Sequence, residues 1–235
     1  MCAAILCLES SGTLCSAAVS GFNSEIFIQS EVGQKHTEVF IGMIRRALES
    51  AGGSADKLDA VALGNGPGAF TGVRVACGLA QGIGWALNLP LIPIGTLTAL
   101  AYCHRNVIAD GCRLLSAIDA RMHETYCAAY RYENGEFVEI LAPCTRKPEE
   151  ITALCDDYSI EYVCGNAFRV YEKEIGSLGS VKLLSAEDVN ASMLMPLAQQ
   201  AFAEGRLTSA ENASPLYVRD HVAMTIKERE AGLFL

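Results

Sequence analysis

A glycine-rich stretch at residues 64–74 reads GNGPGAFTGVR. It follows an apolar, strand-like run at 58–63 and precedes a helical pattern that continues to residue 87. A turn of this kind exposes backbone N–H groups at a helix N-terminus, where a phosphate or another backbone segment can bind. We expect Thr71 to cap the helix, because its hydroxyl can accept from N–H groups that have no intrahelical partner. Glycine loops are common, so the loop alone leaves its ligand undetermined.

Length and composition fit one large domain or two small ones. A chain of 235 residues buries roughly 70% of its unfolded surface, which is enough for a core without disulfides. About half of the residues are apolar (51%) and few are aromatic (7%), as in an α/β protein packed by Ala, Val, Ile and Leu. The formal net charge of −9 argues against a surface that holds RNA on its own. Any RNA would therefore need a partner protein to bind it.

The ten cysteines raise the question of a disulfide framework. Most fall inside apolar runs and none forms a C-x-x-C pair, so we interpret them as small buried side chains in a reducing compartment. The N-terminal apolar run has no basic segment before it, and no run reaches the ~20 apolar residues of a membrane helix. We therefore expect a cytoplasmic protein without a membrane partner.

Two segments of the chain share one layout. Residues 3–28 and 113–140 each read as three strands joined by tight turns, and the first strand ends at an acidic residue in both, Glu9 and Asp119. Helices and strands then alternate in each half. The expected helices are 36–51, 71–87, 96–104, 148–154 and 190–204, and the expected strands are 91–94, 161–164 and 181–184. This duplicated plan favours an α/β fold of two tandem ribonuclease-H-like lobes, the actin-like ATPase (ASKHA) architecture, each a mixed β-sheet flanked by helices.

The lobe boundary is expected near residues 103–111. Residues 1–104 would form the N-terminal lobe with its dimerisation helices, and residues 105–219 a smaller C-terminal lobe. Residues 220–235 would form a C-terminal tail, for which a helix is one candidate conformation. No linker-like stretch separates the halves, so we expect them to pack closely.

Catalytic motifs are scarce. The four histidines form no H-x-x-x-H pair, and neither G-x-S-x-G nor a Walker A motif is present, so we predict no metal site and no catalytic residue. The turn after the first strand and the glycine loop could face phosphates, with Glu9 near a magnesium ion; a hairpin with a solvated carboxylate is the alternative. The candidate cofactor-binding residues are Glu9, Ser10, Ser11, Gly66 and Gly68. For Asp119 and Arg121, one interpretation is a pair across the cleft between the lobes.

The helix after the glycine loop carries small residues four apart, at 72, 76, 80 and 84 and again at 78 and 82. Each glycine inside a helix costs roughly 1 kcal/mol relative to alanine, so close packing should offset this cost. Packing against the chain's own sheet and a subunit interface both fit the pattern. The interface residues that we expect are His36, Phe40, Met43, Gly72, Arg74, Val75, Ala76, Leu79, Ala80 and Ile83. An arginine at Ala76 or Ala80 should then abolish association and leave a folded monomer.

The block 66–74 closely resembles the G-P-G-S-F-T-G-[VL]-R signature of the TsaB (YeaZ) family, which serves the biosynthesis of threonylcarbamoyladenosine (t6A) in tRNA. Further segments agree in order along nearly the whole chain, including 8–11 (LESS), 119–121 (DAR) and 215–219 (PLYVR). The resemblance implies a reduced actin-like fold and a heterodimer with TsaD, the subunit that transfers threonylcarbamoyl to tRNA. It also implies the ATPase TsaE as a partner, a homodimer in isolation, and contact with tRNA only through the complex.

Two departures from the family pattern weaken nucleotide and metal binding by this chain. Glu9 stands where the family has Asp, and Ala69 stands where it has Ser. We therefore expect no intrinsic cofactor, and weak or interface-dependent binding of ATP or ADP with Mg stays open.

The resemblance implies a non-catalytic scaffold and activating subunit rather than an enzyme. It would support transfer of threonylcarbamoyl from threonylcarbamoyl-adenylate to the N6 of the adenosine next to the anticodon of ANN-decoding tRNAs. An autonomous ATPase or kinase of the same fold is the alternative, and it needs a working carboxylate pair at Glu9 and Asp119. A metallopeptidase is a second alternative.

Overall fold

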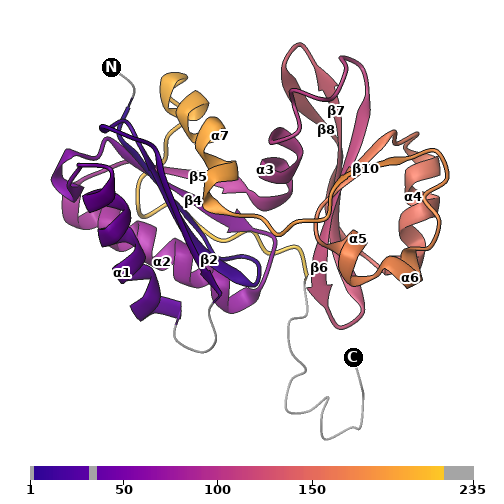
Figure 1. Ribbon diagram of the computed structural model, residues 1–235, viewed down its shortest axis with the longest axis horizontal. Helices are drawn as coiled ribbons and strands as arrows, with labels where there is room; N and C mark the ends of the chain where they lie inside the picture. Colours follow the sequence, from indigo (N-terminus) through magenta and orange to yellow (C-terminus); the bar gives the residue numbers. More distant parts are fainter. Residues whose placement is uncertain (1–2, 32–35, 220–235) are drawn as a thin grey trace, which may run out of the picture.

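The computed structural model describes residues 3–31 and 36–219. In this part of the chain the strands form two five-stranded sheets, one in each lobe (Figure 1). The strands of the first sheet are β1 (Ile5–Glu9), β2 (Leu14–Ser20), β3 (Ile26–Glu31), β4 (Ala60–Gly66) and β5 (Leu91–Gly95), in the order β3-β2-β1-β4-β5. β1, β2 and β3 form an antiparallel meander, whereas β4 pairs with β1 and β5 pairs with β4 in parallel.

The second sheet repeats this arrangement. Its strands are β6 (Arg113–Arg121), β7 (Glu124–Glu133), β8 (Glu136–Arg146), β9 (Tyr162–Cys164) and β10 (Lys182–Ser185), in the order β10-β9-β6-β7-β8. Counted within its own half, each sheet therefore has the strand order 3-2-1-4-5, with the meander antiparallel and the crossovers parallel. This is the ribonuclease-H-like arrangement, and the predicted actin-like architecture with two mixed sheets is confirmed.

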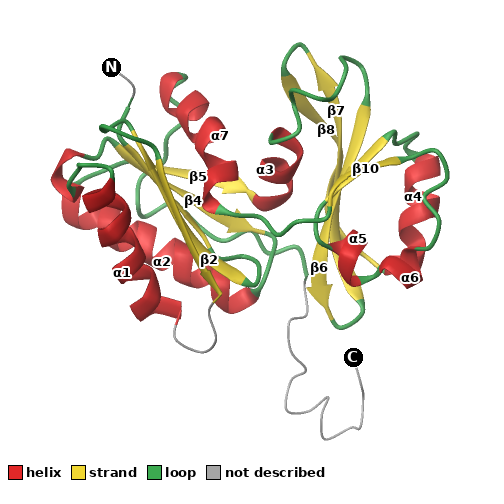
Figure 2. Ribbon diagram, viewed as in Figure 1, coloured by secondary structure: helices red, strands yellow, loops and turns green. Residues whose placement is uncertain are grey.

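Helices cover both faces of each sheet. They are α1 (His36–Ser50), α2 (Phe70–Leu87), α3 (Thr96–Tyr102), α4 (Ile151–Asp157), α5 (Ala167–Val170), α6 (Glu172–Ile175) and α7 (Ala191–Ala203), with short 3-10 turns at Ala55–Lys57 and Pro148–Glu150. Figure 2 shows α1 and α2 on the outer side of the first sheet, α4 to α6 on the outer side of the second, and α3 and α7 between the sheets. Buried apolar clusters fill each of these layers.

Helix α7 follows the second sheet along the chain, but it packs against β1, β2, β4 and β5 of the first sheet (Figure 1). Leu194 of α7 shares a buried cluster with Ile5 of β1. Beyond α7, Thr208 forms a bridge with Leu91 on β5. The expectation that 105–219 forms one C-terminal lobe is therefore wrong for its last part, because the sheet of the first lobe needs α7 to cover its inner face. The predicted tail at 220–235 lies outside the described residues.

Helix α2 begins one residue earlier than expected. Phe70 is its first residue, and Ala69 occupies the N-cap position without a side-chain capping bond. The backbone N–H of Ala69 donates to the carbonyl of Ser11 at 2.6 Å, and this bond fixes the turn ahead of the threonine. The prediction that Thr71 caps the helix is therefore wrong, since Thr71 already lies inside the first turn.

Candidate functional site

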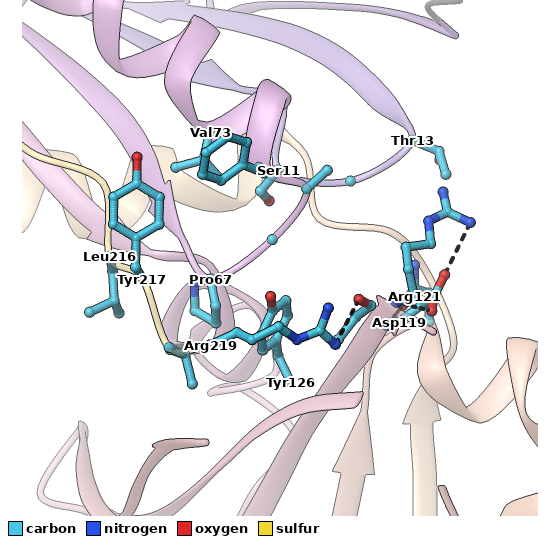
Figure 3. A pocket seen from close by; sticks show the side chains of 17 residues that line it. Ser11, Thr13, Pro67, Val73, Asp119, Arg121, Tyr126, Leu216, Tyr217 and Arg219 are labelled. Carbon is cyan, nitrogen blue, oxygen red and sulfur yellow. Dashed lines mark hydrogen bonds and ion pairs between the residues drawn. The ribbon is translucent and has the colours of Figure 1, made fainter. Parts of the chain in front are cut away.

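A cavity of about 170 Å³ lies in the cleft between the two lobes (Figure 3). Its walls come from the turn between β1 and β2, the glycine loop before α2, the end of β6, and residues 216–219. We call residues 215–219 the cleft segment. The side chains labelled in Figure 3 are Ser11, Thr13, Pro67, Val73, Asp119, Arg121, Tyr126, Leu216, Tyr217 and Arg219. The first-strand ends of both lobes therefore meet at one cavity, as they do in the expected architecture.

Glu9 ends β1, yet its carboxylate does not reach this cavity. The side chain is fully buried, its Oε1 accepts the backbone N–H of Ser11, and its Oε2 packs against Gly64 without a hydrogen-bond partner among the described residues. Burial raises the pKa of Glu9 above its usual value, although hydrogen bonds from the following serines oppose this shift. The predicted position of Glu9 near a magnesium ion is therefore wrong, because the missing side chain of Gly64 lets the carboxyl group turn into the lobe.

We predict that Glu9→Gln raises the free energy of unfolding above that of the parent, and that this gain is larger at pH 8 than at pH 5. A raised pKa means that the folded state binds the Glu9 proton more tightly than the unfolded state, whose pKa is about 4.3. In the parent, the tighter proton binding by Glu9 contributes stability that is fully present below the unfolded pKa. This contribution is lost as pH rises through the folded pKa. Glutamine can still accept the Ser11 N–H without ionising, so we expect a gain of roughly 1–3 kcal/mol at pH 8 in urea unfolding.

Glu139→Gln is the matched control, because the Glu139 side chain is exposed on β8. It should change the free energy of unfolding by a similar small amount at both pH values. A Glu9→Gln effect that is equal at pH 5 and pH 8 would contradict the buried position of the carboxyl group.

The other four candidate phosphate-binding residues divide into two pairs. Ser11 and Gly68 line the cavity and stay predictions. Ser10 is fully buried, and its hydroxyl donates to a carbonyl of α2 at 2.7 Å. Gly66 lies beneath the cleft segment, since a Cβ at this position would come within 3.0 Å of the carbonyl oxygen of Leu216. The prediction is wrong for Ser10, because its hydroxyl is bonded inside the chain, and for Gly66 it stays a prediction.

Asp119 ends β6, the counterpart of β1, and it is held within its own lobe. Its carboxylate accepts the hydroxyl of Tyr171 at 2.7 Å and pairs with Arg121 at 3.2 Å. Its backbone N–H donates to the side chain of Asn166 at 2.8 Å. Arg121 begins the turn to β7 with a φ of 62°, so the ion pair forms inside one lobe and the interpretation of a pair across the cleft is wrong. Of the two first-strand carboxylates, one is thus buried and the other is already paired.

The cleft segment joins the two lobes across the cavity (Figure 3). At one end the backbone N–H of Leu216 donates to the carbonyl of Asn65 on β4 at 2.7 Å. At the other end Arg219 pairs with Glu124 on β7. Sequence reasoning did not assign these residues to the site. The segment is neither helix nor strand, so no hydrophobic periodicity marks where it lies.

Arg74 lies at the first-lobe end of the cleft segment. Its guanidinium group lies 3.7 Å from the centre of the Phe70 ring, and its Nε donates to the hydroxyl of Tyr217 at 2.8 Å. The two rings themselves pack with centroids 5.8 Å apart. Arg74 is exposed, as an interface residue must be, but part of its hydrogen-bonding capacity is used inside the chain.

The inner side of α2 packs against the sheet of its own lobe. Gly72, Ala76 and Ala80 are buried there, and a Cβ at Gly72 would overlap the backbone of the β1–β2 turn. Phe40 and Met43 of α1 are fully buried in the same apolar layer. The interface prediction is wrong for these five residues, because the first sheet already occupies the surface that they form. An arginine at Ala76 or Ala80 would enter this core, so a folded monomer is no longer expected from either change.

The outer side of α2 carries a second apolar stripe. Val75, Leu79 and Ile83 are half-buried there, and Gly78 and Gly82 are exposed with open space where a Cβ would stand. We call these five residues the outer α2 face. Val75, Leu79 and Ile83 pack in part against the buried cluster of the first lobe, and the part of the outer α2 face that stays exposed is a candidate contact surface.

The neighbourhood of the outer α2 face is also apolar. Ile41 of α1 is 54% exposed and Trp85 of α2 is 66% exposed. A groove of about 300 Å³ between α1 and α2 is lined only by apolar residues and glycine. These residues are Leu6, Ile44, Leu48, Ala55, Leu58, Gly82, Ile83, Ala86 and Leu87. Val75, Leu79 and Ile83 stay predicted interface residues. The side chain of His36, which is also predicted to lie at the interface, is outside the described residues.

Within residues 3–31 and 36–219, no three His, Cys, Asp or Glu side chains come together as a metal site requires. No helix there is long and apolar enough to cross a bilayer. The described cysteines form no disulfide with one another; most are buried, and Cys103, Cys112 and Cys144 are partly exposed.

Known proteins resemble the chain over most of its length. A family model described as TsaD, tRNA N6-adenosine threonylcarbamoyltransferase, matches residues 25–227. The tRNA threonylcarbamoyladenosine biosynthesis protein TsaB of Escherichia coli (strain K12) is 34% identical over 229 residues, which cover 93% of this chain and 96% of that protein. The protein of the same description in Haemophilus influenzae is 34% identical over 231 residues, which cover 93% and 94%.

Solved structures agree with the sequence comparison. A Pseudomonas aeruginosa protein described as similar to peptidase YEAZ has a TM-score of 0.80 at 31% identity, with 92% of this chain and 100% of that chain covered. A structure described as YeaZ from Pseudomonas aeruginosa has a TM-score of 0.78, also at 31% identity, with 92% and 99% covered. The resemblance found in the sequence is thus confirmed, and the chain belongs to the TsaB (YeaZ) family, whose members are named for the biosynthesis of threonylcarbamoyladenosine in tRNA.

Proposed function

We propose that this chain is a non-catalytic activating subunit for a TsaD-type threonylcarbamoyltransferase. In this role it binds TsaD, together with the ATPase TsaE, while TsaD transfers threonylcarbamoyl from threonylcarbamoyl-adenylate to the N6 of the adenosine next to the anticodon of ANN-decoding tRNAs. One observation carries the non-catalytic part of the proposal: neither first-strand carboxylate is available at the cleft. Glu9 is buried against Gly64, and Asp119 is bound by Tyr171 and Arg121.

Nucleotide hydrolysis in a cleft of this kind needs carboxylates that hold a cation beside the phosphates. The residues present do not fit that requirement, because the Glu9 carboxyl is withdrawn from the cavity and the Asp119 carboxyl is paired. We therefore propose that the chain has no intrinsic metal–nucleotide site, and that ATP or ADP with Mg binds it weakly or only at an interface.

The outer α2 face supports the partner half of the proposal. It places apolar side chains around two glycines whose missing Cβ atoms allow another helix to come close. We propose that TsaD covers this face in the complex and that a second copy of the chain covers it in isolation. With a net charge of −9, the chain would meet tRNA only through the complex, in the cytoplasm.

A reconstituted modification assay tests this function. Purified chain, TsaD, TsaE, tRNA and threonylcarbamoyl-adenylate are combined, and each component is omitted in turn. We expect t6A to form only when both this chain and TsaD are present, and no t6A when this chain replaces TsaD. Transfer of threonylcarbamoyl by the isolated chain would overturn the proposal.

Calorimetry with Mg–ATP separates this function from the alternative of an autonomous ATPase or kinase. The isolated chain should show no heat of high-affinity Mg–ATP binding and should release no phosphate. Micromolar binding with turnover would favour the alternative instead, and Asp119→Asn should then abolish that turnover.

A further inference from the structure

Cys127 on β7 and Cys144 on β8 lie directly opposite each other in the antiparallel ladder of the second sheet. Their Sγ atoms are 3.7 Å apart. Opposite residues in such a ladder have Cα atoms about 4.5–5.5 Å apart, which lies inside the range of about 4.4–6.8 Å that a disulfide spans. The ladder is irregular at this point, with a register shift between Cys127 and Ala129. The small backbone movement that a disulfide needs would therefore not disrupt a regular stretch of sheet.

The two thiols differ in their surroundings. Cys127 is fully buried, whereas Cys144 is partly exposed. The hydrogen bond from Cys127, with the nearby Arg146 guanidinium, lowers the pKa of the Cys144 thiol to about 7. The same bond, together with burial, raises the pKa of Cys127. One cysteine is therefore partly exposed with a lowered thiol pKa, and its neighbour is a fully buried thiol already in contact with it.

We propose that Cys127 and Cys144 form a reversible redox site that closes to a cross-strand disulfide when a peroxide is the oxidant. The Cys144 thiolate attacks one peroxide oxygen, the O–O bond breaks, and hydroxide leaves, which gives a sulfenic acid on Cys144. The Cys127 sulfur then attacks the Cys144 sulfur, the S–O bond breaks, and the Cys127 proton leaves with the hydroxide as water. In total the two thiols lose two electrons and two protons, and one peroxide and these protons yield two waters.

Peptide mapping of the full chain tests this site. The reduced protein is freed of reductant, treated with stoichiometric hydrogen peroxide, blocked with an alkylating agent and digested without reduction. We expect a linked peptide that joins Cys127 to Cys144, with a loss of about 2 Da for the pair. Dithiothreitol should return both thiols to alkylation. Cys144 should also be the first of the two to react with iodoacetamide in the folded, reduced protein.

Cys155 on α4 provides the matched control, because it is a buried cysteine in the same apolar cluster as Cys127. Cys155→Ala should keep the linked peptide, whereas Cys144→Ala should lose it and leave Cys127 reduced. Mapping of the unaltered chain decides the question even if a variant fails to fold. A sulfinic acid on Cys144 with Cys127 still free, or a link between Cys127 and Cys155, would overturn the proposal.

Discussion

Gly72→Ala should lower the free energy of unfolding by roughly 3 kcal/mol or more, whereas Gly78→Ala should raise it by roughly 1 kcal/mol. A Cβ at Gly72 would overlap the carbonyl of Ser10 in the β1–β2 turn. Backbone atoms on both sides cannot move away as a side chain could, so the helix and the turn must separate. Small domains are stable by only about 5–15 kcal/mol, so a loss of this size is a large share of the chain's stability.

Gly78 provides a control within the same helix. It points away from the core, and no atom lies within 4 Å of a Cβ at this position. Alanine there adds helix propensity without a collision, and Gly82→Ala should repeat the gain for the same reason. Urea titration of all three variants measures the difference. Similar stabilities for Gly72→Ala and Gly78→Ala would mean that α2 does not pack against the first strand turn as described.

Gly78→Arg should leave a folded chain and weaken its binding to TsaD by about 100-fold or more. The guanidinium group has open space in the isolated chain, but in the proposed complex it would enter an apolar contact between helices. A charged group buried there without a partner is strongly unfavourable. Surface plasmon resonance with immobilised TsaD measures the binding, light scattering measures the loss of the homodimer, and the thermal melt checks the fold.

Ala153→Arg is the matched control for this change. Ala153 is exposed on α4, in the second lobe and away from the outer α2 face, so the same side chain is added without touching the proposed contact. It should bind TsaD as the parent does. If folded Gly78→Arg and Gly82→Arg also bind TsaD normally, the outer α2 face is not the docking surface.

The strand plan could be predicted from sequence because each meander has its own alternation and turn residues, such as Asn134-Gly135 between β7 and β8. The packing partner of a helix could not. The pattern at 190–204 predicts an amphipathic helix, but nothing in it says which sheet the apolar side will meet. Helix α2 posed the same difficulty in another form. Both stripes of small residues in this helix have the same spacing of four residues. Only the structure shows that the Gly72 stripe faces the sheet and the Gly78 stripe faces outward.

The candidate site was harder to predict than the fold. A glutamate at the end of a strand is ordinarily solvated, and the burial of Glu9 depends on the absence of a side chain at Gly64, far along the sequence. The cleft segment has no regular structure, so its position could not be deduced from periodicity. Local sequence thus predicts the elements, while the contacts between distant elements decide which polar groups remain at the cleft.

The return of α7 to the first sheet affects how the protein must be made. β5 ends at Gly95, and α7 is complete only at Ala203, about a hundred residues later on the ribosome. At roughly 5–20 residues per second, the inner apolar face of the nascent first sheet stays without its cover for about 5–20 seconds. The first lobe therefore cannot finish folding while its own residues are being synthesised. Its fold is complete only after α7, the last helix in the described part of the chain, has left the ribosome.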